Sequence, residues 1–196
     1  MTTARTSVQR PGPTAAAQPD PAVFRQVLGF FCTGVTVITA ADRGRPAPVG
    51  RTAVEPVGFT CQSFGSLSLD PPLVVFSASR DSTSWSRIRS SGAFCVNVLG
   101  RDQEALCRAF AVSGADKFAG VEWSPGPATG SPRIAGSVAW VECVIEAVHP
   151  GGDHSIVVGG VRALDIADSP VEPLLFYRSA FRGMAPSGPG VTPAPP

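Results

Sequence analysis

The stretch Val57–Ser84, VGFTCQSFGSLSLDPPLVVFSASRDSTS, determines how the rest of the chain is interpreted. It places many small and hydroxyl-bearing residues around the apolar run Leu73–Phe76, and Arg80 is its only basic residue. Small residues let a ligand approach the backbone closely, and hydroxyls and free N–H groups bind phosphate or carbonyl oxygens. A core strand does not need so many hydroxyls. The stretch therefore predicts a cradle for a flat, phosphate-bearing cofactor.

The size and charge of the chain exclude several classes of partner. Its 196 residues predict one domain with a substantial core. The formal net charge of +1 argues against a nucleic-acid partner, because neutralising phosphates requires a basic surface. No apolar stretch has the character of a signal peptide or the length of a membrane span. We therefore expect a soluble protein with no membrane partner.

The cysteines predict a reducing compartment. There are five of them, an odd number, and no two form a C-x-x-C pair. Several lie in apolar runs, where a free cysteine behaves as a small hydrophobic residue. His149 and His154 are the only histidines, so a zinc site would need ligands far apart in the sequence. We expect a cytoplasmic protein with no metal site.

Composition also predicts the domain boundaries. Residues 1–19 are rich in Ala, Thr, Gln and Pro, and residues 185–196 are rich in Pro. Such segments bury too little apolar surface to offset the entropy of ordering. We expect two disordered tails that flank one folded domain at residues 20–184.

Hydrophobic periodicity predicts three helices and six or seven strands. The helices are expected from Asp20–Pro21 to about Gly34, at Ser84–Ser90 and at Asp102–Phe110. The clearest strands are Val35–Thr39, Leu73–Ser77, Phe94–Leu99, Val138–Val148, Ile156–Leu164 and Leu174–Tyr177. The region Gly114–Pro132 is expected to be irregular, and Glu142 and Glu146 to share one face of their strand. Helices that interrupt the strands favour an antiparallel barrel with appended helices over a doubly wound sheet.

Several common motifs are missing. The sequence contains no G-x-G-x-x-G and no G-x-x-x-x-G-K-[ST], so neither a dinucleotide fold nor a P-loop is indicated. It also lacks the G-x-S-x-G elbow of serine hydrolases.

Five segments in one order resemble the flavin reductase-like family, the small reductase components of two-component flavin-dependent monooxygenases. They are Gly34–Thr39 (GVTVIT), Gly58–Val74 (GFTCQSFGSLSLDPPLV), Phe94–Leu99 (FCVNVL), Gly152–Val161 (GDHSIVVGGV) and Pro173–Arg178 (PLLFYR). The resemblance implies an FMN-binding split β-barrel of Greek-key type and a homodimer with flavin near the subunit interface. It also implies hydride transfer from NADH or NADPH to flavin, and release of the reduced flavin to a separate monooxygenase.

The resemblance assigns the cradle to the two ends of the flavin. Thr60, Cys61, Gln62 and Ser63 match the family segment along the isoalloxazine ring, although small residues at a strand end would look the same. The residues that match the phosphate segment are Ser77, Ser82, Thr83 and Ser84, and ordinary helix capping is the alternative for Ser82 and Ser84. Asp81 stands where some relatives carry a basic residue, so Arg80 or Lys117 would have to supply the positive charge.

Four further residues are candidates by the same resemblance. Lys117, the only lysine, lies in a D-K-F segment and would reach the phosphates, unless it is merely solvated. His154 matches the family histidine beside the nicotinamide, where it is the one catalytic candidate; a structural turn histidine is the alternative. Tyr177 and Arg178 match the segment near the nicotinamide dinucleotide, although a core tyrosine and a surface arginine would fit equally.

The choice of cofactor stays open at this stage. FAD is favoured weakly over FMN, and NADH over NADPH because no arginine cluster is placed to meet a 2′-phosphate. A split-barrel protein that binds flavin or haem without turnover is the alternative function, and oxidation of a small substrate in the same pocket is a third. The segment Asp42–Glu55 is longer than the turn common in relatives, and its role is open.

Overall fold

The computed structural model describes residues 18–42, 54–169 and 171–184. Most of the Asp42–Glu55 segment and nearly all of the two predicted tails lie outside these residues. The helices are α1 (Pro21–Leu28), α2 (Thr83–Ser91) and α3 (Glu104–Ala111), with a 3-10 turn at Arg101–Gln103. The strands are β1 (Thr33–Gly34), β2 (Thr36–Asp42), β3 (Glu55–Cys61), β4 (Gly65–Leu69), β5 (Pro72–Ser79), β6 (Ala93–Val98), β7 (Trp123–Pro125), β8 (Pro132–Ile134), β9 (Ala139–Gly151), β10 (His154–Ile166), β11 (Leu175–Tyr177) and β12 (Ala180–Arg182).

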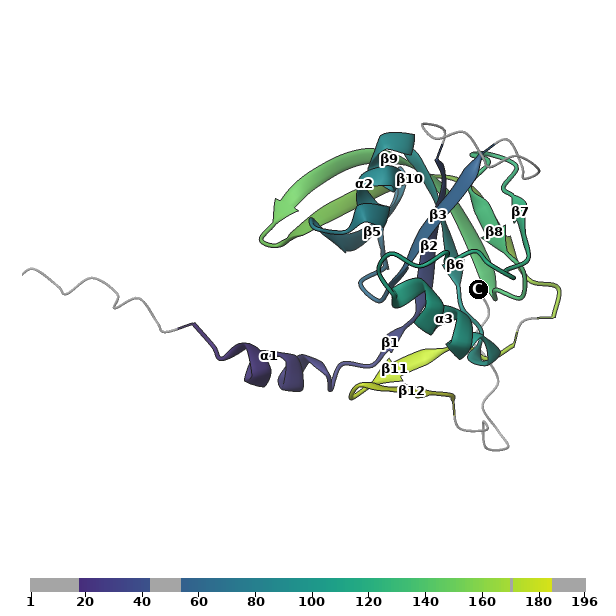
Figure 1. Cartoon of the computed structure of the whole chain (residues 1–196). Helices are drawn as coiled ribbons and strands as arrows, with labels where there is room; N and C mark the ends of the chain where they lie inside the picture. The colour runs from purple at the N-terminus through teal and green to yellow at the C-terminus, as the bar shows by residue number, and fades with distance from the viewer. Residues whose placement is uncertain (1–17, 43–53, 170, 185–196) are drawn as a thin grey trace, which may run out of the picture.

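Seven strands form one curved antiparallel sheet in the order β3-β2-β6-β9-β10-β5-β4. The long β9–β10 hairpin extends beyond the body of the sheet, and α2 and α3 lie against the other strands (Figure 1). Outside this sheet, β1, β11 and β12 form a small sheet, and β7 pairs with β8. The predicted mainly antiparallel β architecture with appended helices is therefore confirmed.

The sheet closes on itself without a complete ladder of hydrogen bonds. The first strand of the order, β3, approaches β5 rather than β4, and side chains bridge the gap. Just past the end of β3, the Ser63 hydroxyl accepts a hydrogen bond from the Ser77 N–H at 2.8 Å and donates one to the Ser77 carbonyl at 3.1 Å. This closure sets the distance between the two halves of the Val57–Ser84 stretch.

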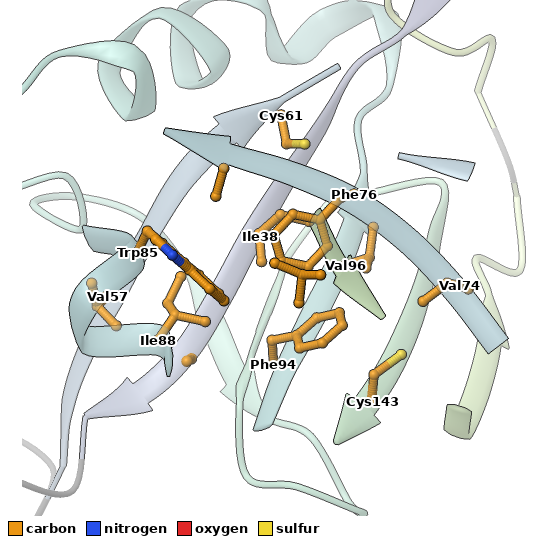
Figure 2. Packing of buried hydrophobic residues seen from close by; sticks show 13 residues of the cluster. Ile38, Val57, Cys61, Val74, Phe76, Trp85, Ile88, Phe94, Val96 and Cys143 are labelled. Carbon is orange, nitrogen blue, oxygen red and sulfur yellow. The ribbon is translucent and has the colours of Figure 1, made fainter. Parts of the chain in front are cut away.

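The larger hydrophobic cluster fills the inside of the curved sheet. Phe76 is fully buried at its centre, with ring centroids 5.2 Å from Phe94 and 6.0 Å from Trp85 (Figure 2). Trp85 and Ile88 come from α2 and form the apolar face of that helix. Gly92, in the αL conformation with φ of 73°, ends the helix.

A second cluster lies between the sheet and α3. All seven residues of β2 are buried, because alternate side chains enter the two clusters on opposite faces. On the side of α3, Cys107 and Phe110 are buried and Leu106 is half-buried. A Cβ at Gly58 would lie 2.9 Å from Phe110, so glycine allows α3 to approach β3 closely.

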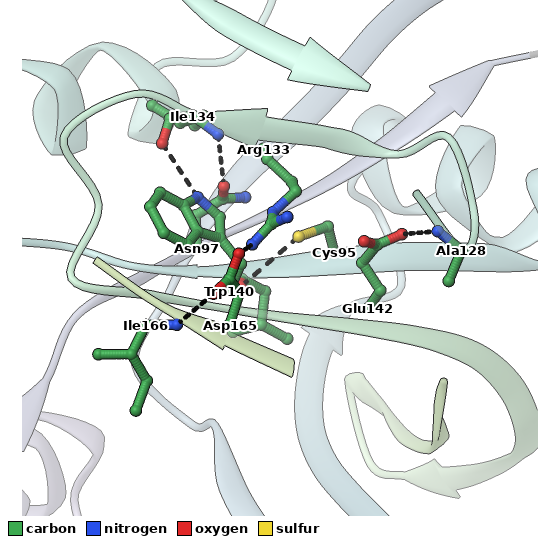
Figure 3. A network of polar contacts seen from close by, with 10 residues as sticks. Cys95, Asn97, Ala128, Arg133, Ile134, Trp140, Glu142, Asp165 and Ile166 are labelled. Atoms are coloured by element: carbon green, nitrogen blue, oxygen red, sulfur yellow. Dashed lines mark hydrogen bonds and ion pairs between the residues drawn. The ribbon is translucent and has the colours of Figure 1, made fainter. Parts of the chain in front are cut away.

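A buried amide ties β6 to the loop that carries β8. Asn97 is fully buried, and its side-chain nitrogen donates to the Val37 carbonyl at 3.1 Å and the Pro132 carbonyl at 3.4 Å. Its side-chain oxygen accepts from the Ile134 N–H at 2.7 Å (Figure 3). Thr39 on β2 also hydrogen-bonds Pro132. These bonds hold the β7–β8 region against the sheet.

Three expectations differ from the structure. The first helix ends at Leu28 rather than near Gly34, and its apolar residues are more than half exposed. The region Gly114–Pro132 is not wholly irregular, because it contains β7. A register shift on β9 opposite Val158/Gly159 places Glu146 at the surface while Glu142 is buried.

In the described part of the chain, no helix is both long enough and apolar enough to cross a bilayer.

We predict that Asn97→Ala lowers the free energy of unfolding by about 3 kcal/mol, because the Ile134 N–H and the Pro132 carbonyl lose a buried partner. Urea denaturation followed by circular dichroism measures this change. Gln103→Ala is the matched control, since Gln103 bonds Gly100 and Ala135 nearer the surface. Equal losses in the two variants would contradict the role given to Asn97.

Candidate functional site

The end of β3 and the strand β5 bring the predicted ring-binding residues to the closure of the barrel. The Thr60 hydroxyl donates to the Cys107 carbonyl of α3 at 2.6 Å, so its hydrogen is already committed. Ser63 is exposed and bonded to Ser77, and Gln62 is exposed beside it. Gln62 and Ser63 are therefore the two of these four residues that a ring could reach, and Thr60 is half-buried against α3.

Cys61, the fourth residue of the segment, is buried beneath this surface. Its Sγ lies 3.3 Å from the Ser63 Oγ and 3.9 Å from the Ser77 carbonyl oxygen. Burial raises the pKa of the Cys61 thiol, so the thiol is protonated at neutral pH. A neutral, buried thiol supports the position of Ser63 and is a poor nucleophile.

The N-terminus of α2 has the geometry of an anion site. Ser82 is the N-cap, and its hydroxyl accepts from the Trp85 N–H at 3.2 Å. The first-turn N–H groups of a helix have no partner within the helix, and the helix dipole favours negative charge there. Thr83 is exposed and Ser84 is buried at this end. The capping alternative therefore holds for Ser82, and it leaves the anion site intact.

Lys117 is not merely solvated. Its Nζ donates to the Gly58 carbonyl at 3.2 Å and lies 3.4 Å from the Ser84 hydroxyl, so it joins β3 to the start of α2. Partial burial lowers the pKa of Lys117 below its ordinary value of 10.5. An anion at the start of α2 would lie next to this ammonium group. The negative charge of the anion would stabilise the charged form of Lys117.

An open cleft of about 890 Å³ continues from this point. Its walls are the first half of β3, the first turns of α2 and the segment 114–125. Arg87 of α2 also lines it, and its guanidinium lies 2.6 Å from Asp42 and 3.3 Å from Glu55. These carboxylates neutralise Arg87, so Lys117 carries the charge available to an anionic ligand.

His154 lies next to the loop that precedes α2. It pairs with Ser79 at the start of β10, and the neighbouring Asp153 carbonyl accepts from the Arg80 N–H at 3.0 Å. The Arg80 guanidinium points to Gly152, 3.5 Å from its carbonyl oxygen, rather than to the cleft. Lys117 is therefore the better candidate to compensate Asp81, which is exposed.

Within one chain, Tyr177 and Arg178 belong to a different region. They lie at the β11–β12 turn, where Arg178 covers the Phe30 ring at 4.7 Å and Tyr177 meets it edge-on at 6.3 Å. Tyr177 is half-buried rather than a core residue. Nothing among the described contacts joins this turn to His154.

The sequence did not reveal three parts of the site. The Gly58 carbonyl holds Lys117, and Arg87 and Trp123 line the cleft. Arg87 and Trp123 match no segment of the resemblance, and Gly58, which begins one of them, received no role from it. A backbone carbonyl has no sequence signal, and an arginine or a tryptophan in these positions is commonly structural. Only the fold brings residues 54–58 and 114–125 together.

A model of the flavin reductase like domain matches residues 28–185. The reductase subunit HsaB of a flavin-dependent monooxygenase from Rhodococcus jostii (strain RHA1) is 48% identical over 176 residues, which are 89% of this chain and 84% of that protein. The chain belongs to the flavin reductase like family. The resemblance inferred from the five segments is confirmed.

Solved structures agree with this membership. A nitrilotriacetate monooxygenase component B from Mycobacterium thermoresistibile superposes with a TM-score of 0.76 at 46% identity, covering 89% of this chain and 90% of that one. The NADH:FAD oxidoreductase SgcE6 of Streptomyces globisporus, solved with NAD and FAD fragments, gives a TM-score of 0.75 at 38% identity, covering 87% and 98%. The predicted split β-barrel fold and oxidoreductase class are confirmed.

The residues of this flavin reductase fit a flavin nucleotide. Ser63 and Ser77 offer a polar edge at the barrel closure, and the start of α2 with Lys117 offers a phosphate site. The Ser84 hydroxyl lies between these N–H groups and the ammonium group. The strands β3 and β5 lead from the closure to these two groups, since Gly58 lies on β3 and β5 precedes α2.

We predict that FAD binding weakens as the pH rises from neutral towards 10.5, because a phosphate binds the charged form of Lys117 and burial lowers the pKa of Lys117 below that ordinary value. The dissociation constant should rise as the ammonium group loses its proton. Quenching of flavin fluorescence in titrations across this range measures it.

Lys117→Arg is the matched control, because an arginine stays charged throughout that range. Its affinity for FAD should vary less with pH than that of the natural chain. An equally steep profile in both proteins would show that another group causes the pH dependence.

Proposed function

We propose that this flavin reductase oxidises NADH, reduces FAD and releases the reduced flavin to a separate monooxygenase. The observation that carries the proposal is the junction of α2 with Lys117, placed beside the barrel closure. A relative at 48% identity is named as the reductase subunit of such a monooxygenase, and a solved relative as an NADH:FAD oxidoreductase. The second of these names favours FAD over FMN and NADH over NADPH.

The chain contributes binding and orientation. When bound, the flavin supplies the ring nitrogen that accepts hydride from nicotinamide, so neither a protein nucleophile nor a metal is required. The Ser63–Ser77 pair orients the polar edge of the ring, and the amide groups of α2 with Lys117 hold the phosphates. Many modest contacts of this kind suit a ligand that must leave again.

His154 is proposed to position the nicotinamide. Its Nδ1 lies 2.7 Å from the Asp153 carboxylate, and this hydrogen bond lowers the pKa of Asp153. An ionised Asp153 favours the tautomer with the proton on Nδ1, which leaves Nε2 as an acceptor for a carboxamide N–H. The side chain is 46% exposed, so a ligand can reach it.

A homodimer is part of the proposal. The apolar residues of α1 and the segment that follows are more than half exposed, namely Val23, Phe24, Val27, Leu28, Phe30 and Phe31. An eight-residue helix is not stable alone, and α1 projects away from the barrel (Figure 1). A second copy would cover this face. It would also approach Tyr177 and Arg178, which adjoin it, and so bring them near a nicotinamide site.

The cytoplasmic location remains an inference from chemistry. All five cysteines are free thiols, and four of them are buried. Burial raises the pKa of Cys95 and of Cys143 to about 12, so these thiols are inert in their strands. The cytoplasm would also supply the NADH that the proposed activity consumes.

The alternative of a non-catalytic binder has less support. A haem protein needs an axial ligand in its pocket. Both histidines lie on the β9–β10 hairpin, and neither lines the cleft. A flavin binder without turnover would need no group beside the nicotinamide, whereas His154 lies close to the start of α2.

We predict rapid oxidation of NADH when FAD is added to the purified protein, followed as loss of absorbance of the reduced nicotinamide. His154→Ala should raise the KM for NADH about tenfold through a lost hydrogen bond, and leave the dissociation constant of FAD unchanged. His149→Ala, an exposed change on the same hairpin, should have no effect. If neither NADH nor NADPH is oxidised in the presence of either FAD or FMN, the proposed activity is wrong.

We also predict that Phe24→Ser combined with Val27→Ser converts a dimer to a monomer, because two exposed apolar anchors of α1 are removed. Size-exclusion chromatography with light scattering measures the mass. Arg25→Ser combined with Gln26→Ser alters the same helix without removing apolar surface and should leave the dimer intact. A natural chain that elutes as a monomer at all concentrations would contradict the dimer.

A further inference from the structure

The cleft beyond Lys117 is larger than a phosphate requires. It continues along β3 away from the barrel closure, from Gly58 back to Val54. Four residues of a strand span about 13 Å, which is room for another part of a ligand beyond its phosphate. The opposite wall is the segment 114–125, which ends in Trp123 and Pro125 of β7.

The order of groups along this surface matches the order of parts in a dinucleotide. The barrel closure at Ser63 lies past one end of β3, the α2–Lys117 junction faces Gly58 near its middle, and Trp123 lies across the cleft beyond. A flavin ring at the closure and a phosphate at Lys117 would direct whatever follows the phosphate towards Trp123. FMN ends at that phosphate, whereas FAD continues with a second phosphate and adenosine.

Trp123 has the character of a stacking platform. Its indole is half-buried and lines the cleft, and the Phe118 ring supports it edge-on at 6.2 Å. Its strand is fixed by pairing with β8, where Trp123 lies opposite Ile134, and by the bond from the Ala135 N–H to the Glu122 carbonyl at 3.0 Å. Asn97 in turn holds Ile134 (Figure 3). An aromatic face held in this way binds a planar base at a low entropic cost.

The charges around Trp123 suit a neutral base. Arg87 is already paired with Asp42 and Glu55, and Glu122 is exposed at the rim. Arg133, which lines a second pocket with Trp123, is likewise paired with Asp165. Lys117 lies at the other end, where a diphosphate would be. A cation at one end of the cleft and an uncharged aromatic ring further along it match an adenosine diphosphate whose phosphates face α2.

We propose that Trp123 stacks on the adenine of FAD and gives this flavin reductase its preference for FAD over FMN. The inference rests on the proposed function, since it takes the flavin phosphate to lie at the start of α2. It makes Trp123 a specificity residue that lies away from the reacting atoms.

Equilibrium binding without NADH tests the inference. Titrations of FAD and FMN, followed by flavin fluorescence, give both dissociation constants for the natural chain, Trp123→Ala and Trp123→Phe. Loss of one base–aromatic stack should raise the FAD constant about tenfold in Trp123→Ala, and the FMN constant should stay within about twofold. Trp123→Phe keeps a ring and should recover most of the affinity for FAD.

Trp140→Phe is the matched control. Trp140 lies on β9, packs against Arg133 at 4.7 Å and donates to the Ile134 carbonyl, outside the cleft. The variant Trp140→Phe should leave the ratio of the FAD and FMN dissociation constants unchanged. Unchanged FMN binding by Trp123→Ala also serves as the test that this variant is folded.

Three results would overturn the inference. The first is an equal loss of affinity for FAD and for FMN in Trp123→Ala, and the second is no loss of affinity for either flavin. The third is a raised KM for NADH with unchanged FAD affinity, which would assign the cleft to the adenosine of the nicotinamide cofactor. Failure of the proposed function has a different signature, because the natural chain would then bind neither flavin nor oxidise NADH.

Discussion

The hydrogen bonds between Ser63 and Ser77 are the constraint on which the site depends. The sheet has two ends, and these bonds join its first strand to β5 where no ladder continues. They leave hydroxyl and backbone groups exposed at the closure and set the direction in which β5 leads to α2. A complete ladder would saturate those backbone groups, and a wider gap would separate the ring end from the phosphate end.

Much of the fold was predictable because its signals are local. Hydrophobic periodicity predicted β2, β6, β9, β10 and α2. The errors arose where tertiary contacts decide. The short strand β7 exists because β8 and Asn97 hold it, and the register shift on β9 separates Glu146 from Glu142. Neither depends on the residue types of the strand itself.

The resemblance predicts the parts of the candidate site, whereas their arrangement comes from the fold. It proposes roles for the ring segment, the start of α2, Lys117 and His154, and these residues lie on β3, β5, α2 and the elements bonded to them. The resemblance could not show that Lys117 donates a hydrogen bond to the Gly58 carbonyl or that Trp123 lines the cleft. These contacts join segments about 60 residues apart in the sequence. Tyr177 and Arg178 lie elsewhere in the same chain, at the β11–β12 turn.

The exposed face of α1 has a consequence for how the protein behaves in dilute solution. In the proposed dimer, α1 is stable only against a second copy, so its order depends on the protein concentration by mass action. Arg178 and Tyr177 hold the segment after α1, and they would loosen with it. For the proposed dimer we therefore expect the affinity for nicotinamide to fall on dilution, while the proposed flavin site, which lies within one barrel, keeps its affinity for flavin.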